Sequence, residues 1–274
     1  MTALPLNEIL MLLAALVAAG LVGGLIAGLF GVGGGTVIVP ALFYAFEVLR
    51  LGGESNLHVA IGTSLATIVA TSWRSLKAHR EHGAVDEVVL KTWTPWVALG
   101  GLIGAGVAGF TSMEGLAIVY GVCLALIAAQ MGLLPERIVL RRDMPTGWGR
   151  RVTATVIGGL SAMMGIGGGS FGGLTMTLCG RPIHQAVATA SGFGLAIGAA
   201  ASLGFVVFGW DAGGRPPLSL GYVNIPAAVV MGLLTTAVAP YGARLAHRLN
   251  KTTLRRVFAI YLLLTALSVV VKAL

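Results

Sequence analysis

The sequence predicts an all-α integral membrane protein made of two inverted-topology repeats, and three observations lead to this prediction. The chain of 274 residues is 56% hydrophobic and only 10% charged, with a mean hydropathy of +0.90, so it lacks the polar residues that keep a soluble surface hydrated. Long apolar stretches recur from one end of the chain to the other. A short glycine-rich motif occurs twice, once in each half.

The apolar stretches define the expected helices in order. They lie at residues 9–30, 36–49, 57–73, 88–110, 115–134, 152–180, 185–209, 222–240 and 254–273. The first stretch follows no basic leader and continues into glycine, so we expect it to be retained as a membrane segment and not cleaved as a signal peptide. No part of the chain is left over for a soluble domain.

Lysine and arginine gather in the short connections between these stretches, which accounts for the net charge of +8. The larger group occupies residues 74–91, 137–151, 181 and 244–256, and the smaller group comprises Arg50, Arg215 and Lys272. By the positive-inside rule the larger group is cytoplasmic, so we expect a multi-pass protein of the inner cell membrane with both termini outside. We therefore expect the protein to interact with the lipid bilayer and not with nucleic acid.

The two halves carry matching motifs in the same order. The sequence GLIAGLFGVGGGT at residues 24–36 is echoed by GGLSAMMGIGGGS at residues 158–170. A second pair follows, with HVAIGT at residues 58–63 and HQAVAT at residues 184–189. Two motifs that recur in one order indicate an internal repeat.

The longest basic connection is the expected boundary between the repeats. It gives an N-terminal repeat at 1–136, a basic cytoplasmic linker at 137–151 and a C-terminal repeat at 152–274. The stretch at 57–73 must run from outside to a basic loop, whereas its counterpart at 185–209 begins beside a basic loop and runs outward, so the repeats should be inverted. Each glycine segment then enters the membrane, breaks into a pair of half-helices and returns, and the two breaks meet near the midplane.

The glycine breaks form the predicted binding site. Irregular backbone at membrane depth is tolerated only where it is buried in protein or lines a polar cavity. Glycines leave space for a ligand, and unpaired N–H groups at the start of a half-helix favour an anion. The predicted residues are Gly33, Gly34, Gly35 and Thr36 in the first half and Gly167, Gly168, Gly169 and Ser170 in the second. The alternative is that these glycines only permit a sharp turn and close helix packing.

The paired GxGGG motifs, each followed by a helix with an AxxT pattern, resemble the sulfite exporter TauE/SafE family of anion permeases. The resemblance covers essentially the whole chain. It implies a secondary transporter that moves a small, mostly sulfur-containing anion, such as sulfite, thiosulfate or a sulfonate, by alternating access with protons as the coupling ion. It also places the substrate near Thr63, Ser64 and Thr189, although Ala190 stands where the first half has Ser64.

Other hydroxyl groups extend this predicted site. Thr63, Thr67 and Thr71 are spaced so that they form one polar stripe on a helix, which can face a cavity. The alternative is that each hydroxyl bonds to a carbonyl of its own helix. Ser191, one position after Ala190, completes the expected set of ligands in the second half.

Three further side chains suit proton coupling or the admission of an anion. His58 and His184 hold equivalent places at the mouths of opposite faces, and histidine titrates near neutral pH. Arg181 lies on the same short connection as His184, where its charge can draw an anion inward. The alternatives are interfacial histidines without a coupling role and an arginine that only anchors the topology.

An anion channel and an intramembrane hydrolase are the other function classes that we considered. Ser191 and His184 lie two turns apart on one helix, too far for a direct hydrogen bond. Ser161 with His184 remains open, but no carboxylate accompanies this pair, so we do not expect an enzyme. We expect no cofactor and no metal, and the pattern predicts no particular oligomeric state.

Overall fold

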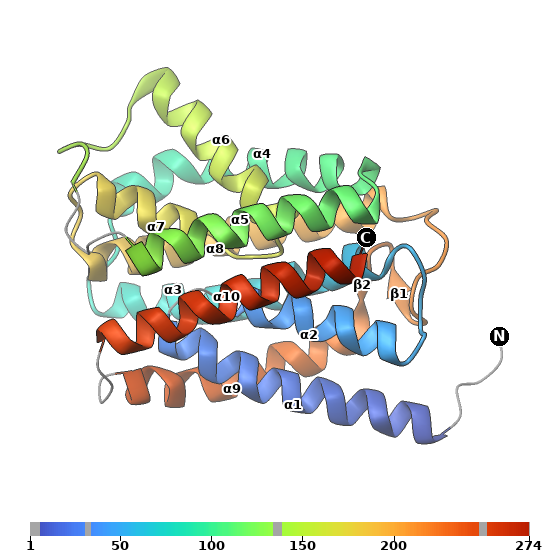
Figure 1. Cartoon of the computed structure of the whole chain (residues 1–274). Helices are drawn as coiled ribbons and strands as arrows, with labels where there is room; N and C mark the ends of the chain where they lie inside the picture. The colour runs from blue at the N-terminus through green and yellow to red at the C-terminus, as the bar shows by residue number, and fades with distance from the viewer. Residues whose placement is uncertain (1–5, 31–33, 134–138, 247–250, 274) are drawn as a thin grey trace.

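The computed structural model describes residues 6–30, 34–133, 139–246 and 251–273, and within these ranges it contains ten α-helices and one antiparallel pair of short strands. The elements, labelled in Figure 1, are α1 (Leu6–Phe30), α2 (Gly35–Val48), α3 (Asn56–Glu81), α4 (Glu87–Phe110), α5 (Met113–Leu133), α6 (Gly147–Met163), α7 (Gly169–Leu178), α8 (Ile183–Phe208), β1 (Ser219–Leu220), β2 (Val223–Asn224), α9 (Ile225–Ala246) and α10 (Lys251–Ala273). The prediction of an all-helical membrane protein is confirmed. The small hairpin, in which Ser219 pairs with Asn224, was not predicted.

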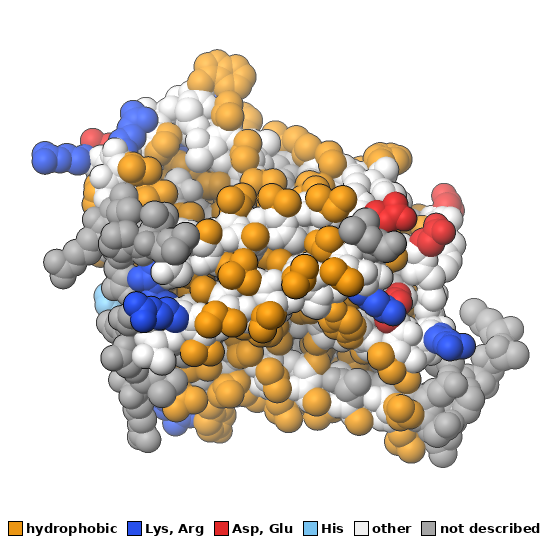
Figure 2. Space-filling view, in the orientation of Figure 1, with side chains coloured by type: hydrophobic (Ala, Val, Ile, Leu, Met, Phe, Trp, Pro, Cys, Tyr) orange, Lys and Arg blue, Asp and Glu red, His pale blue; other side chains and the backbone are white. Residues whose placement is uncertain are grey.

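The exterior of the helical bundle is apolar. Within the described residues, five helices are long and apolar enough to cross a membrane, namely α4, α5, α8, α9 and α10. Large hydrophobic side chains are exposed along the outside of the bundle, among them Leu126, Leu264 and Val271 (Figure 2). An apolar surface of this extent would make a soluble protein aggregate, and it suits contact with lipid tails.

The second glycine segment consists of two short helices. Helices α6 and α7 contain 17 and 10 residues, which corresponds to about 25 Å and 15 Å of helix. Neither is long enough to cross roughly 30 Å of hydrocarbon. The carbonyl of Leu178, at the end of α7, accepts the N–H groups of Leu140 and Arg141, so α7 returns to the connection from which α6 sets out (Figure 1).

The first glycine segment differs from this arrangement in one respect. Helix α1 has 25 residues, about 37 Å of helix, so it is no half-helix. Helix α2 has 14 residues and ends at the same end of the molecule at which α1 begins (Figure 1). Only α2 therefore matches the predicted half-helix in the first half.

Helices of the two halves pack against each other in matched pairs. Helix α1 packs along α9, α6 packs along α4, α3 pairs with α8, and α5 pairs with α10. The backbones in two of these pairs approach so closely that only glycine fits. A Cβ atom on Gly100 or Gly104 of α4 would overlap the carbonyl oxygen of Thr155 or Gly159 on α6, and one on Gly242 of α9 would overlap that of Leu25 on α1.

The two ends of the bundle carry different charges. Most of the visible Lys and Arg side chains gather at one end, and most of the visible Asp and Glu side chains gather at the other, where the β-hairpin lies (Figure 2). We call these the basic end and the hairpin end. At the hairpin end, Ser55 donates its hydroxyl to the carbonyl of Gly213 (2.7 Å), and Gly53 donates its N–H to the carbonyl of Gly214 (2.8 Å).

Candidate functional site

The two glycine segments meet inside the molecule. Gly35, the first residue of α2, lies against Gly165 and Ile166 in the turn between α6 and α7, and a Cβ atom on Gly35 would overlap the carbonyl oxygen of Gly165. Residues 34–40 and 164–168 are buried. We call this contact between the start of α2 and the α6–α7 turn the glycine junction. In this conformation the glycine junction is closed to solvent.

Helices α3 and α8 hold the α6–α7 turn from two sides. Gly165 has φ +64°, a left-handed conformation that favours glycine, and it packs on Ile61 of α3. Gly168 packs on Phe193 and Gly194 of α8, where a Cβ atom would lie 2.5 Å from the Phe193 Cβ. The turn is therefore wedged between the central helices of the two halves.

A helix begins at each side of the glycine junction. Gly34 precedes α2 with φ +75°, and its carbonyl accepts the N–H groups of Val37 and Ile38 at 3.0 and 2.9 Å. Gly168 precedes α7, and its carbonyl accepts the N–H of Gly172 at 2.9 Å. The first N–H groups of such helices have no intrahelical acceptor and carry partial positive charge. Of the predicted ligands, Gly33 lies outside the described residues.

Three buried hydroxyl groups next to the glycine junction have no hydrogen-bond partner among the described residues. They belong to Thr36 in the first turn of α2, Ser170 in the first turn of α7 and Ser161 in the last turn of α6. Thr36 is 1% exposed and Ser161 is 0% exposed. An unpaired buried hydroxyl costs about 1–3 kcal/mol. Each of these hydroxyls can therefore donate a hydrogen bond to a ligand. Ser161 was not predicted as a ligand from the sequence.

Ser64 connects the two halves at the glycine junction. Its hydroxyl donates to the carbonyl oxygen of Gly165 at 2.8 Å, and both groups are buried. Ala190, at the equivalent position in the second half, is buried but has no hydroxyl to donate. The difference seen in the sequence is therefore a structural asymmetry, because the Ser64 contact to the α6–α7 turn has no counterpart from Ala190.

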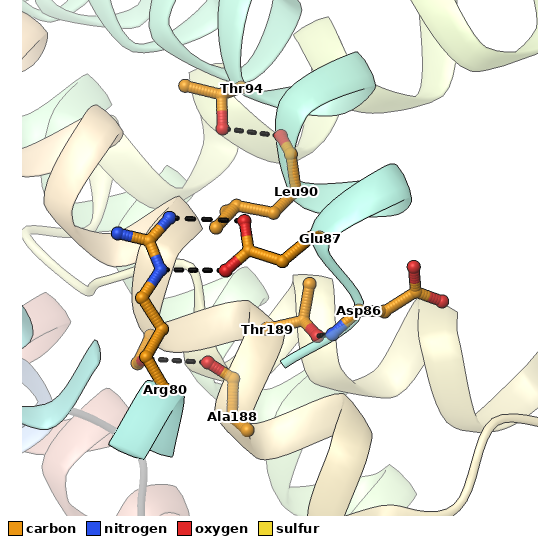
Figure 3. Close-up of polar contacts among 8 residues, drawn as sticks. Arg80, Asp86, Glu87, Leu90, Thr94, Ala188 and Thr189 are labelled. Atoms are coloured by element: carbon orange, nitrogen blue, oxygen red, sulfur yellow. Dashed lines mark hydrogen bonds and ion pairs between the residues drawn. The ribbon is translucent and has the colours of Figure 1, made fainter. Parts of the chain in front are cut away.

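Thr63 and Thr189 hold the beginnings of two helices. The Thr63 hydroxyl oxygen accepts the backbone N–H of Asn224 at 2.9 Å, and that of Thr189 accepts the backbone N–H of Asp86 at 2.9 Å (Figure 3). Asn224 immediately precedes α9 and Asp86 immediately precedes α4. Each threonine thus contacts the other half of the chain, a structural role that the motif alone did not indicate.

The other predicted hydroxyls bond within their own helices. Thr67 donates to the carbonyl of Ser64 at 2.6 Å, Thr71 donates to carbonyls of the preceding turn at 3.2 and 3.3 Å, and Ser191 donates to the carbonyl of Ala188 at 2.6 Å. For Thr67 and Thr71, the structure agrees with the alternative interpretation of the polar stripe.

The two histidines do not occupy equivalent environments. His58 is 4% exposed, its Nε2 lies 3.0 Å from the carbonyl oxygens of both Ala108 and Thr111, and its ring stacks on Tyr222 at 4.9 Å. His184 is exposed at the start of α8. The expectation that both lie at a mouth of the protein is therefore wrong for His58, which is packed inside.

Arg181 lies at the basic end, where its guanidinium forms an ion pair with the carboxylate of Asp86 at 3.4 Å. Its side chain is 39% exposed, which leaves it accessible to solutes. Ser161, the serine considered for a hydrolase, has no hydrogen-bond partner among the described residues, so it is not paired with His184 as a nucleophile requires.

Comparison with known proteins identifies the family. The model of the family described as Sulfite exporter TauE/SafE matches residues 16–269, which include both sides of the glycine junction. The chain belongs to the TauE/SafE family. Family membership makes it a membrane transporter and confirms the resemblance seen in the motifs.

Two relatives of this TauE/SafE protein that match it over nearly their whole length are named as probable membrane transporters. A probable membrane transporter protein of Haemophilus influenzae is 32% identical over 260 residues, which are 92% of this chain and 96% of that protein. A probable membrane transporter protein of Methanocaldococcus jannaschii is 25% identical over 258 residues, covering 90% and 91% of the two chains. No solved structure is significantly similar to this chain.

Proposed function

We propose that this protein is a secondary transporter of a small sulfur-containing oxyanion, of the sulfite, thiosulfate or sulfonate type, coupled to protons. The anion binds at the glycine junction. Its ligands are N–H groups at the starts of α2 and α7, together with the hydroxyls of Thr36, Ser161 and Ser170.

The observation that carries this proposal is the set of three unpaired hydroxyls beside the glycine junction. A buried hydroxyl without an acceptor is costly, and an oxyanion brings several acceptor oxygens to one place. A hydrogen bond to a charged group is also stronger than one between neutral groups. A ligand with this chemistry therefore removes an unfavourable feature of the empty site.

Neutral donors suit a site that must release its ligand. The described residues of the glycine junction, 34–40 and 164–170, contain no lysine or arginine, and neither do the segments of α3 and α8 beside it, 61–68 and 189–194. A full positive charge buried at this depth would hold an anion tightly, whereas helix ends and hydroxyls bind it more weakly. Weak binding allows turnover at the anion concentrations that a transporter meets.

Reciprocal packing supports alternating access. The glycine junction lies between α3 and α8, and the pairs α1–α9 and α6–α4 join the two halves in matching ways. A relation of this kind between repeats 1–136 and 152–274 lets one half rock against the other about a fixed site. Support for proton coupling comes from the resemblance of the motifs to the family.

Flux measurements on the purified protein in proteoliposomes test the proposal. The panel is sulfite, thiosulfate, a small sulfonate, sulfate, acetate and chloride, each with and without an imposed pH gradient. We expect saturable flux of one sulfur oxyanion that the gradient accelerates. Unitary currents without saturation would identify a channel instead, and absence of flux for the whole panel would contradict the proposed substrate class.

Serine-to-alanine variants test the site itself. Ser161→Ala and Ser170→Ala each remove a donor to the anion, so KM should rise about 10-fold or more, since a hydrogen bond to a charged group contributes about 1.5–3 kcal/mol. Thermal stability should stay the same or increase, because an unpaired buried hydroxyl is lost. Ser202→Ala is the matched control, because Ser202 bonds to the carbonyl of Ala199 within α8. Unchanged KM in both test variants would remove these hydroxyls from the site.

A further inference from the structure

Asp86 connects three elements at the basic end. Its backbone N–H donates to Thr189 on α8, its Oδ1 accepts the N–H of Val89 in the first turn of α4, and its Oδ2 lies 3.4 Å from an Nη of Arg181. The carboxylate points away from the neighbouring pair of Arg80 and Glu87 (Figure 3). Arg181, on the connection between α7 and α8, is thus the cation that faces it.

Arg181 is only partly engaged by this carboxylate. Charge-assisted N–H···O bonds are commonly about 2.7–2.9 Å long, and the Arg80–Glu87 pair has one such contact at 2.7 Å. The Arg181 contact is longer, at 3.4 Å, and its buried Nε has no partner among the described residues. The Arg181 side chain is nevertheless 39% exposed, so a solute from the basic end can reach it.

Asn224 fulfils the role of Asp86 at the hairpin end without a charge. Its N–H donates to Thr63, and its Oδ1 accepts the N–H of Ala227 in the first turn of α9 at 3.1 Å. Capping the helix therefore requires only an oxygen acceptor at this position, and the threonine contact requires only the backbone N–H. Asn224 also donates its Nδ2 to the carbonyl of Pro217 at 2.9 Å, a contact that Asp86 does not need. The negative charge of Asp86 has a separate effect, and it acts on Arg181.

A second arginine lies close to Arg181. Burial raises the pKa of the Cys179 thiol at the end of α7, the positive charges of Arg141 and Arg181 oppose this rise, and the negative charge of Asp143 adds to it. The N–H of Arg141 donates to the carbonyl of Leu178 at 3.1 Å, so its backbone lies at the end of α7 as well. Two arginines are thus balanced here by the carboxylates of Asp143 and Asp86, and displacement of Asp86 shifts this balance toward positive charge, which attracts an anion.

We propose that Arg181 is the first binding site of the transported oxyanion at the basic end, and that the anion binds by displacing the carboxylate of Asp86 from the guanidinium. This inference rests on the proposed function. The planar guanidinium presents two parallel N–H groups that match two oxygens of an oxyanion, in the same way as they match a carboxylate. Asp86 then competes with the anion for the Arg181 guanidinium. When the anion displaces the carboxylate, the ion pair that joins the α7–α8 connection to the start of α4 is broken.

The carboxylate of Asp86 affects anion binding in two ways, through its ion pair with Arg181 and through its repulsion of the bound anion. The Arg181–Asp86 contact is long, at 3.4 Å, and the Asp86 side chain is only 12% exposed. Asp86 keeps the N–H of Val89 as a donor when Arg181 turns away, so its carboxylate is not left without a hydrogen bond. A carboxylate within a few ångströms of a bound anion repels it. Removing the charge of Asp86 should therefore tighten binding of the anion on this side by about 3- to 10-fold.

Side-specific kinetics in membrane vesicles of both orientations test the inference, with sulfite as the probe and chloride to match ionic strength. Asp86→Asn keeps the backbone N–H that Thr189 accepts and an Oδ1 that accepts the N–H of Val89, so stability should change little, and KM for sulfite should fall about 3- to 10-fold on the basic side only. Arg181→Gln should raise this KM about 10-fold. In the Arg181→Gln background, Asp86→Asn should have no further effect, because the side chain with which it competes is gone.

Glu87→Gln is the matched control, because it removes the neighbouring carboxylate, which is exposed and pairs with Arg80, and it should leave KM on the basic side almost unchanged. The sulfite-induced rise in unfolding temperature in detergent gives a second readout that does not depend on flux. Transport of sulfite with an unchanged KM in Asp86→Asn, or independent effects of the two substitutions, would overturn this inference alone. Absence of any transport in the unmodified protein would instead overturn the proposed function.

Discussion

Thr63 and Thr189 illustrate how a single hydroxyl joins two distant parts of this chain. Each oxygen accepts the N–H of a residue that immediately precedes a helix of the other half. That N–H is buried in the Thr63 contact, where water cannot replace a lost acceptor. The contact therefore contributes to stability through a backbone group that has no other described partner at this place.

Replacing these threonines by valine separates this role from that of an ordinary helical hydroxyl. Thr63→Val leaves the Asn224 N–H without its acceptor and should lower the free energy of unfolding by about 1–3 kcal/mol. Thr71→Val is the control and should change it by less than about 0.5 kcal/mol, because the Thr71 hydroxyl bonds only to its own helix. Unfolding temperatures in detergent compare the two, and an equal loss in both would contradict the special role of Thr63.

Residues of the candidate site could be predicted only where they belong to one of the repeated motifs. Thr36 and Ser170 follow the two glycine motifs and lie at the glycine junction. Ser161 could not be found in this way, since the first motif has Ala27 at the matching place. The partners of Thr63 and Thr189 were equally hidden, because they lie more than a hundred positions away and donate through the backbone, which every sequence provides.

At the scale of elements, glycines set the distance between paired helices. The α4 glycines face backbone carbonyls of α6, and Gly242 of α9 faces α1 in the same manner. Without an apolar driving force between helices in lipid, close backbone approach supplies the packing energy that holds such pairs together. These interfaces explain why so many glycines occur in long helices despite their low helix propensity.

Gly104→Ala tests this interface. The new methyl group would overlap the carbonyl of Gly159, so the helices must separate, and we expect a loss of about 1–3 kcal/mol in the free energy of unfolding. Gly232→Ala is the control on α9, where a Cβ meets no atom within 4 Å, and it should be neutral or stabilise by about 0.5–1 kcal/mol. Thermal unfolding distinguishes them, and a harmless Gly104→Ala would mean that the α4–α6 interface is less tight than described.

The extent of each helix was predicted well where hydropathy changes sharply and poorly elsewhere. Helix α6 begins at Gly147, inside the predicted linker, because charged residues can continue a helix beyond its apolar part. Arg151 does so while its guanidinium lies over the rings of Trp96 and Trp148, at 5.0 and 5.5 Å. The β-hairpin has too few residues to give an apolar period and was missed for that reason.

At the scale of the whole molecule, the charge difference between the ends predicts the orientation in the membrane. Helix α1 begins and α10 ends at the hairpin end, and the basic residues gather at the opposite end (Figures 1 and 2). By the positive-inside rule we predict that the basic end lies in the cytoplasm. An alkaline phosphatase fused after residue 274 should therefore be active, and one fused after residue 145 should be inactive. The reverse pattern of activity would invert the proposed topology.

Because α1 packs along α9, this pair of helices can form only late in the synthesis of the chain. Roughly two hundred residues separate the end of α1 from the beginning of α9. At about 5–20 residues per second, a ribosome needs about 10 to 40 seconds to make them. Throughout this interval the face of α1 that packs on α9, which includes Gly20 and Gly24, has no partner. A nascent chain that stops after α8 would therefore leave this face of α1 without the helix that covers it in the finished protein.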